Sequence, residues 1–243
     1  MNNTGMNSFV LRSRPPMLRR RSSRRLPSLH VALARRWWQW RISADDQLKR
    51  AFDVVFSAIV LLCISPLLAG IALLIKLEDR GPVIFRQVRV GRHGREFHMF
   101  KFRSMRVDAE QRLRELLAKN QHKTGVTFKI KNDPRVTRIG YWIRKFSLDE
   151  LPQFWNVLIG DMSVVGPRPP VPREVALYTL ADRRRLAVAP GITCIWQVSG
   201  RAQIDFHGQV ELDVRYIETR SFWRDLGIIT KTVPAVLSGS GAY

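Results

Sequence analysis

The sequence predicts an α+β fold, namely a mainly helical, monotopic membrane protein with a re-entrant helix-break-helix hairpin, a small β-hairpin or sheet, and interfacial amphipathic helices. Three observations support this prediction. The run Val54–Ile75 contains no charged residue, basic residues flank both of its ends, and two short alternating segments follow it. We expect three parts: a disordered Arg-rich tail over residues 1–44, the membrane hairpin over 45–78, and a cytoplasmic domain over 79–243.

The tail carries a large share of the positive charge. The whole chain has a formal net charge of +21, and its first 44 residues contain arginines but no acidic residue. Such a composition cannot bury a core, and it requires an anionic partner: nucleic acid, an acidic membrane surface or a phosphorylated substrate. Trp37, Trp38 and Trp40 alternate with arginines, which indicates an anchor on anionic membrane lipid.

The apolar run is long enough to cross a membrane as one helix. At 1.5 Å per residue it would extend about 33 Å, against about 30 Å for a hydrocarbon core. Ser65-Pro66 interrupts it at its middle, where proline removes a backbone hydrogen bond. Because basic residues lie on both flanks, both ends are expected on the cytoplasmic side. A re-entrant hairpin is therefore preferred, and a single spanning helix is the alternative.

Several elements are expected after the hairpin. Two strands, Pro82–Gly91 and Glu96–Ser104, are joined by a turn at Arg92–Arg95, and their dense basic residues form a first candidate for anion binding. Helices are expected from Asp108, over Val136–Phe146, over Glu174–Val188 and over Val210–Leu237, with a strand over Ile192–Val198. The two cysteines, Cys63 and Cys194, do not indicate a disulfide, and the five histidines lack metal-ligand spacing.

The segment Ser147–Pro152 carries two adjacent carboxylates, Asp149 and Glu150. One interpretation is a capping box, in which Glu150 satisfies the backbone N–H of Ser147. The other makes Asp149 a nucleophile on a phosphorylated substrate, kept ionised by free N–H groups at a helix start. The two interpretations compete only for Glu150. Pro152 would be the fifth helical residue, so the first turn is expected to be irregular.

Arg168 stands between two prolines in Gly166-Pro-Arg-Pro169. Stiff flanks preorganise its guanidinium, for which a bidentate phosphate contact is a natural use. A solvated arginine in a proline-rich turn is the alternative. Ser199-Gly-Arg201 is a second turn that exposes an arginine.

Residues from about Lys49 to Tyr243 closely resemble the bacterial sugar transferases, the monotopic phosphoglycosyl transferases that act on polyprenyl phosphate. The motifs that carry this resemblance occur in the family's order over about 190 residues. They are Lys49-Arg-Ala-Phe-Asp53, Ser65-Pro-Leu67, Lys101-Phe-Arg-Ser-Met105, Asp133-Pro-Arg135, Ser147-Leu-Asp-Glu-Leu-Pro152, Gly160-Asp-Met-Ser163, Val165-Gly-Pro-Arg-Pro169, Pro190-Gly-Ile-Thr193, Trp196-Gln-Val-Ser-Gly-Arg201 and Glu211-Leu-Asp-Val214. Cys194 replaces the family's glycine after Pro-Gly-Ile-Thr.

The resemblance implies a two-step transfer of a sugar phosphate in a catalytic domain over 79–243. Asp149 matches the family's nucleophile, which takes sugar-1-phosphate from a UDP-sugar and releases UMP, and Glu150 matches its partner in the dyad. Polyprenyl (undecaprenyl) phosphate then accepts the group, as the first step of exopolysaccharide or related glycoconjugate assembly. The family requires Mg²⁺, with Asp149 as the expected protein contact. The expected substrate-binding residues are Arg168, Arg201, Asp213, Lys101 and Arg144.

The resemblance also implies a place at the cytoplasmic face of the bacterial inner membrane. Glucose or galactose is the expected sugar, and a homo-oligomer is compatible with the sequence. The alternative function is a membrane-tethered basic protein that binds nucleic acid or acts as a scaffold. No nucleic-acid partner is expected, because the globular part has 20 acidic residues and no recognisable nucleic-acid-binding module.

Overall fold

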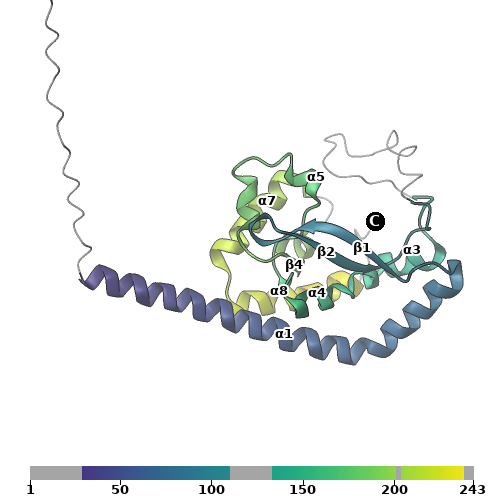
Figure 1. The fold of residues 1–243 in the computed structure, drawn as a ribbon, viewed down its shortest axis with the longest axis horizontal. Helices are drawn as coiled ribbons and strands as arrows, with labels where there is room; N and C mark the ends of the chain where they lie inside the picture. The colour runs from purple at the N-terminus through teal and green to yellow at the C-terminus, as the bar shows by residue number, and fades with distance from the viewer. Residues whose placement is uncertain (1–28, 110–132, 201–203, 238–243) are drawn as a thin grey trace, which may run out of the picture. The chain divides into compact units, whose positions relative to one another are not determined.

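The computed structural model describes residues 29–109, 133–200 and 204–237 of the chain (Figure 1). The chain divides into two units, residues 1–44 and 45–243. In the first unit, the backbone is helical from Leu29 onward, within the segment that was expected to be disordered. All that follows concerns the second unit.

Helix α1, Leu29–Asp79, supplies the apolar segment. Among the described residues, Asp45–Asp79 is the one helix long and apolar enough to cross a membrane, with a mean hydropathy of 2.8 over its most apolar stretch, of which 11% is buried. The helix continues through Ser65 and Pro66, and Figure 1 shows it bending. Ser65 Oγ donates to the carbonyl of Leu62 at 2.8 Å. The expected helix break is thus a bend in a continuous helix, because one proline removes a single backbone bond.

The predicted β-hairpin is confirmed. Strands β1 (Ile84–Val90) and β2 (Glu96–Phe102) pair antiparallel around the short 3₁₀ turn η1 (Arg92–Gly94). Side chains alternate between the two faces of a hairpin, so Arg89, Met99 and Lys101 share one face. This face lines the candidate site described below.

Helix α4 (Gln153–Ile159) is fixed to the hairpin by one side chain. The amide of Asn156 accepts from the backbone N–H of Phe100 at 2.9 Å and donates to the carbonyl of His98 at 2.7 Å. It thereby pairs with the edge of β2 as a neighbouring strand would. Asn156 is fully buried, so these bonds satisfy polar groups that would otherwise be costly.

Strands β3 (Ser163–Val165) and β4 (Gly191–Thr193) form a second, parallel sheet. Their backbones lie unusually close where Gly166 meets Gly191. A Cβ atom on Gly191 would lie 2.0 Å from the backbone nitrogen of Gly166. Glycine is therefore required at this contact, which brings the segment after β3 beside β4.

Two hydrophobic clusters form the core. One lies between α4, β3 and the C-terminal helices α7 (Phe206–Thr219) and α8 (Phe222–Leu237), with Val157, Val165 and Ile228 at its centre. The other packs the second half of α1 against the hairpin and α3 (Arg138–Lys145) through Ile71, Ile75, Phe102 and Ile143. In Figure 1, α4 and α8 lie beside the first half of the apolar segment, and ring contacts Phe56–Phe154 and Phe52–Phe222 confirm this.

Two predicted elements are wrong. In place of a helix over Glu174–Val188 there is a short helix, α5 (Pro172–Val175), and a 3₁₀ turn, η4 (Asp182–Ala187), because the Asp182 carboxylate accepts from the backbone N–H of Thr179 and starts a new turn. In place of a strand over Ile192–Val198, β4 ends at Thr193 and helix α6 (Ile195–Ser199) follows. Ile195 and Val198, three residues apart, both pack on the core, so tertiary packing overrides their strand propensity.

The other predicted elements are found in part. The helix expected over Val136–Phe146 is α3, and the one expected over Val210–Leu237 is divided into α7 and α8. The helix expected from Asp108 lies mostly outside the described residues.

Candidate active site

The turn that carries the two carboxylates is not a helix start. Ser147 has a φ of 55°, in the left-handed region, and its side chain makes no capping hydrogen bond. Its N–H donates to the carbonyl of Arg144 at 3.0 Å, so Ser147 ends α3, as a left-handed residue commonly does. The capping-box interpretation is therefore wrong. Asp149 and Glu150 belong to a 3₁₀ turn, η3 (Leu148–Glu150), and α4 begins only after Pro152, which agrees with the expected irregularity.

Glu150 is engaged by basic side chains instead of by the backbone. Lys101 Nζ lies 2.6 Å from its Oε1, and the Arg168 guanidinium lies 3.9 Å from the same oxygen. Burial alone would raise the pKa of Glu150, but Lys101 and Arg168 lower that pKa to about 2. Glu150 is therefore an anion at neutral pH and holds two cations in place.

Asp149 has a different environment. Its carboxylate makes no ion pair or side-chain hydrogen bond with the described residues. Burial and the charge of Glu150 raise the pKa of Asp149 to about 6, although Lys101 and Arg144 oppose the rise. The expected α-helix start is a 3₁₀ turn instead, and there a backbone hydrogen bond lowers the pKa of Asp149 by less than burial raises it. Asp149 is nonetheless mostly ionised at pH 7, and a poorly solvated carboxylate is a good nucleophile.

Arg168 projects from a segment whose other residues are buried. Residues 162–167 and 169–171 are buried, whereas the side chain of Arg168 is 38% exposed. The backbone on either side of Arg168 is held by hydrogen bonds from β1 and β4. The N–H of Val90 donates to the carbonyl of Pro170 at 2.9 Å, and the N–H of Gly191 donates to that of Pro167 at 2.9 Å. The guanidinium is therefore held in position by the chain that carries it.

Arg89 is a further cation of this site. It is one of the basic residues of the hairpin, which the sequence marks only as a group as a candidate for anion binding. Its guanidinium donates to the carbonyl of Pro169 at 2.8 Å and to the Gln87 side chain at 2.7 Å. Burial and the neighbouring Arg168 lower the pKa of Arg89 to about 10, so it remains charged at neutral pH. The feature that identifies Arg89 as a site residue is its burial beside a second arginine, Arg168. That feature exists only in the folded chain and cannot be seen in the sequence.

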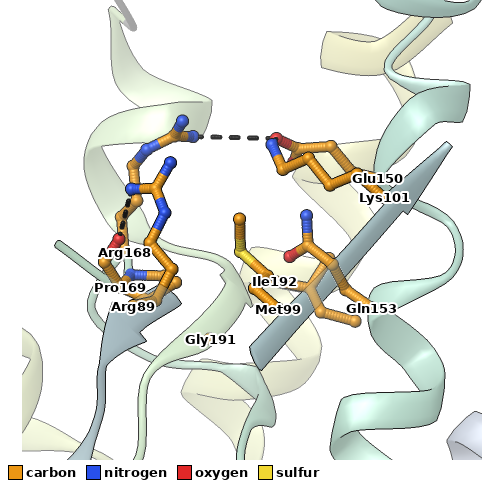
Figure 2. A pocket seen from close by; sticks show the side chains of 9 residues that line it. All are labelled: Arg89, Met99, Lys101, Glu150, Gln153, Arg168, Pro169, Gly191 and Ile192. Carbon is orange, nitrogen blue, oxygen red and sulfur yellow. Dashed lines mark hydrogen bonds and ion pairs between the residues drawn. The ribbon is translucent and has the colours of Figure 1, made fainter. Parts of the chain in front are cut away.

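These side chains line a small hollow that is open to solvent. Figure 2 shows Arg89 and Arg168 on one wall and Glu150 and Lys101 on the other, with Met99, Gln153 and Ile192 between them. Pro169 and Gly191 complete the lining, and Asp149 is not part of it, although it directly precedes Glu150 and interacts with Lys101. Three cations face one paired carboxylate, so an anionic group such as a phosphate is attracted to this space.

The other predicted binding residues are placed differently. Arg144 lies near enough to Asp149 to lower its pKa. Asp213 is buried in α7, where its carboxylate pairs with Arg185, and it does not line the pocket. Burial raises the pKa of Asp213 to about 6, against the opposing effect of Arg185. Arg201 lies outside the described residues.

The residues present are compatible with Mg²⁺ at Asp149, although they form no complete metal site. No group of three or more histidine, cysteine, aspartate or glutamate side chains that could hold a metal occurs in the described part of the chain. Mg²⁺ is usually held by one or two carboxylates together with substrate phosphates and water. Asp149 offers one such carboxylate, whereas that of Glu150 is occupied by Lys101.

Fold and site together define a membrane-associated α+β protein whose cationic pocket, next to a carboxylate, suits a phosphorylated substrate. The chain belongs to the bacterial sugar transferase family, whose model matches residues 44–239. It is 57% identical over 166 residues to the galactosyl transferase CpsE of Streptococcus agalactiae, covering 68% of this chain and 37% of that protein. It is 46% identical over 200 residues to the undecaprenyl-phosphate galactose phosphotransferase of Salmonella typhimurium, covering 81% and 42%.

A third relative is similar in length. The exopolysaccharide production protein ExoY of Rhizobium meliloti is 42% identical over 198 residues, which cover 80% of this chain and 88% of that protein. The chain spans less than half the length of the first two relatives. The predicted family is thus confirmed, and together with the apolar helix it indicates membrane association.

Proposed function

We propose that this protein transfers sugar-1-phosphate from a UDP-sugar to polyprenyl (undecaprenyl) phosphate, as a first step of exopolysaccharide or related glycoconjugate assembly. One observation carries the proposal. The fold gives two adjacent carboxylates different surroundings. Glu150 forms an ion pair with Lys101, whereas Asp149 forms no ion pair or side-chain hydrogen bond with the described residues. The names of the relatives from Salmonella and Rhizobium support this reaction and its product class.

In the first step, a carboxylate oxygen of Asp149 attacks the phosphorus atom that bears the sugar. A new bond forms between that oxygen and phosphorus, the diphosphate P–O bond breaks, and UMP leaves with the bonding electrons. Repulsion between an approaching carboxylate and a phosphate is about 4 kcal/mol at 4 Å and an effective dielectric of 20. Lys101, Arg168 and Arg89 offset this repulsion because they are fixed around the same pocket.

In the second step, a phosphate oxygen of the polyprenyl phosphate attacks the same phosphorus atom. The bond to Asp149 breaks, the carboxylate is regenerated, and polyprenyl-diphospho-sugar is formed. Arg168, exposed at the pocket, is suited to bind the incoming phosphate. Mg²⁺, bound by Asp149 and substrate phosphates, would neutralise negative charge on those phosphates. Glu150 serves as the positioning partner of Lys101 and Arg168, not as the nucleophile.

The acceptor is a lipid, so the site must lie at the headgroup level of the bilayer. Exposed aromatic residues on several helices support such a location. Trp142 on α3 is 56% exposed, Trp155 on α4 is 54% exposed and Trp223 on α8 is 76% exposed. Lys145 Nζ lies 5.1 Å from the centre of the Trp142 ring, so α3 combines an aromatic with a cation, as helices on anionic lipid do. We place the protein at the cytoplasmic face of the inner membrane, where UDP-sugars are made.

The test is UMP release by detergent-solubilised protein with polyprenyl phosphate and a series of UDP-sugars, starting with UDP-galactose and UDP-glucose. Wild-type protein should release UMP with at least one donor, and Asp149→Asn should reduce the rate by at least about 10³-fold. Asp45→Asn, which changes an exposed aspartate, is the matched control and should retain activity. Near wild-type turnover by Asp149→Asn would contradict the assignment of Asp149 as the nucleophile.

A further inference from the structure

A buried polar network joins the start of the apolar segment to the C-terminal helix. Lys49 Nζ lies 3.3 Å from the carboxylate of Asp53 and 2.7 Å from that of Asp225 on α8. Asp53 and Asp225 are 3% and 2% exposed. Burying two carboxylates around one ammonium is costly, and apolar residues of similar volume would hold these helices together at least as well. Holding α1 and α8 together therefore does not by itself explain why this network is polar.

The network ends on the backbone of strand β3. The Asp53 carboxylate accepts from the N–H of Val164 at 3.1 Å. The Tyr216 hydroxyl lies 2.8 Å from the Asp225 carboxylate and 3.0 Å from the carbonyl of Val165. The Tyr216 hydroxyl has one proton to donate to these two acceptors. Directional bonds to a particular N–H and a particular carbonyl add to the side-chain packing that holds β3 in register.

Strand β3 leads directly to the phosphate-binding arginine. Val165 is followed by Gly166, Pro167 and then Arg168, and all of these residues except Arg168 are buried. Proline fixes its own φ and restricts the residue before it, so this short connection has little freedom to absorb a movement of β3. A shift in the register of β3 would therefore move the Arg168 guanidinium, which lies 3.9 Å from Glu150.

The same part of α1 also contacts the helix that follows the Asp149 turn. The guanidinium of Arg50 donates to the carbonyls of Val157 and Leu158, the latter at 2.8 Å. These carbonyls are at the C-terminal end of α4, where a cation is favourable. Thus Asp53, paired with Lys49, contacts the strand before Arg168, while the neighbouring Arg50 contacts the helix after Asp149 and Glu150.

We propose that the network of Lys49, Asp53, Asp225 and Tyr216 positions β3, and through it Arg168, relative to the Asp149 turn. The docking of the membrane helix then sets the geometry of the active site. These four are positioning residues, since none of them lines the pocket. The inference rests on the proposed function and assigns a role to residues that the reaction itself does not use.

The test is a double-mutant cycle between Tyr216→Phe and Arg168→Lys, measured as UMP release in detergent. Tyr216→Phe removes only the hydroxyl, and we expect about a tenfold loss in kcat/KM, mostly in kcat. In the Arg168→Lys background the same change should cost less than about twofold, because the arginine to be positioned is already gone. Tyr178→Phe is the matched control, a buried tyrosine whose hydroxyl contacts Arg185 at 3.1 Å, and it should leave kcat and KM unchanged.

A second pair of variants separates positioning from folding. Asp53→Asn keeps an acceptor oxygen for the N–H of Val164 and should retain most activity, whereas Asp53→Ala should lose about tenfold at the same folded fraction. Equal losses for Tyr216→Phe in both backgrounds, or a loss in Asp53→Ala explained fully by a smaller folded fraction, would overturn the inference while leaving the proposed function intact. Absence of UMP release by the wild-type protein would instead overturn the proposed function.

Discussion

Lys101 contacts Glu150 and leaves the adjacent carboxylate of Asp149 without a side-chain partner among the described residues. The pKa values of these two neighbouring carboxyl groups are therefore shifted in opposite directions. Burial raises the pKa of Glu150, but Lys101 and Arg168 outweigh this effect and lower that pKa to about 2. For Asp149, burial and the charge of Glu150 raise the pKa to about 6. Glu150 is therefore an anion that holds cations in place, and Asp149 is the reactive group in the reaction that we propose.

The pH dependence of the reaction should report Asp149. Only its ionised form can attack, so kcat/KM for the UDP-sugar should rise with pH through about 6 and then level off. In Glu150→Gln a nearby negative charge is lost and Lys101 is released, and both changes lower the pKa of Asp149. The midpoint of the acid limb should therefore move to lower pH in that variant. An unchanged or higher midpoint would show that Glu150 does not control the ionisation of Asp149.

At the scale of elements, the site depends on the close approach of β3 and β4. Gly166 and Gly191 meet with their backbones in contact, and this contact holds the Gly166–Pro169 segment beside β4. The pocket is lined from both sides of this contact, by Arg168 and Pro169 after β3 and by Gly191 and Ile192 in β4. Gly166 and Gly191 thus determine the position of the Arg168 side chain.

Gly191→Ala should be severely destabilising, because its Cβ would lie 2.0 Å from the backbone nitrogen of Gly166. Backbone cannot yield as a flexible side chain can, so we expect a loss of about 2–4 kcal/mol in unfolding free energy and loss of UMP release. Thermal unfolding in detergent measures the first. Gly227→Ala is the control, since nothing lies within 4 Å of its added Cβ and alanine favours a helix. Comparable stability of the two variants would show that β3 and β4 do not depend on this contact.

The sequence predicted the elements whose signal is local. The hairpin and α3 follow from local sequence patterns, and the apolar helix follows from a run without charged residues. The environment of the dyad could not be predicted, because it depends on Lys101, 49 positions away in the sequence from Glu150. The capping-box prediction was wrong because Ser147 adopts a left-handed conformation and follows the end of α3. The sequence pattern alone does not show which of these two positions a serine occupies. The burial of Arg89 beside Arg168 required the folded chain.

At the scale of the whole catalytic unit, α1 is both membrane anchor and part of the core. Its apolar side chains are largely exposed at positions such as Leu62 and Leu67, while Ile71 and Ile75 pack against the hairpin and α3. A soluble core helix would not leave so many leucines exposed. The bend of α1, a helix that contains Pro66, suits a segment that enters a membrane and returns to the same side.

Cysteine labelling in cells tests this topology. In a Cys63→Ser background, Gln47→Cys and Pro82→Cys place exposed thiols before and after the apolar segment. Both should react only after the cytoplasm is made accessible to a membrane-impermeant reagent. Pro66→Ala is an informative third variant, because restoring the backbone bond should favour a straight helix. Labelling of Gln47→Cys from the periplasm with Pro82→Cys still cytoplasmic would demonstrate a single spanning helix instead.

In the proposed reaction, Asp149 becomes covalently bound to the sugar phosphate. Incubating the protein with an active UDP-sugar in the absence of polyprenyl phosphate tests it most directly. We expect a burst of about one UMP per active protein, a sugar-phosphate adduct that mass spectrometry of the peptides places on Asp149, and discharge of that adduct when polyprenyl phosphate is added. No UMP without the acceptor, or an adduct on Glu150 or any other residue, would contradict the account.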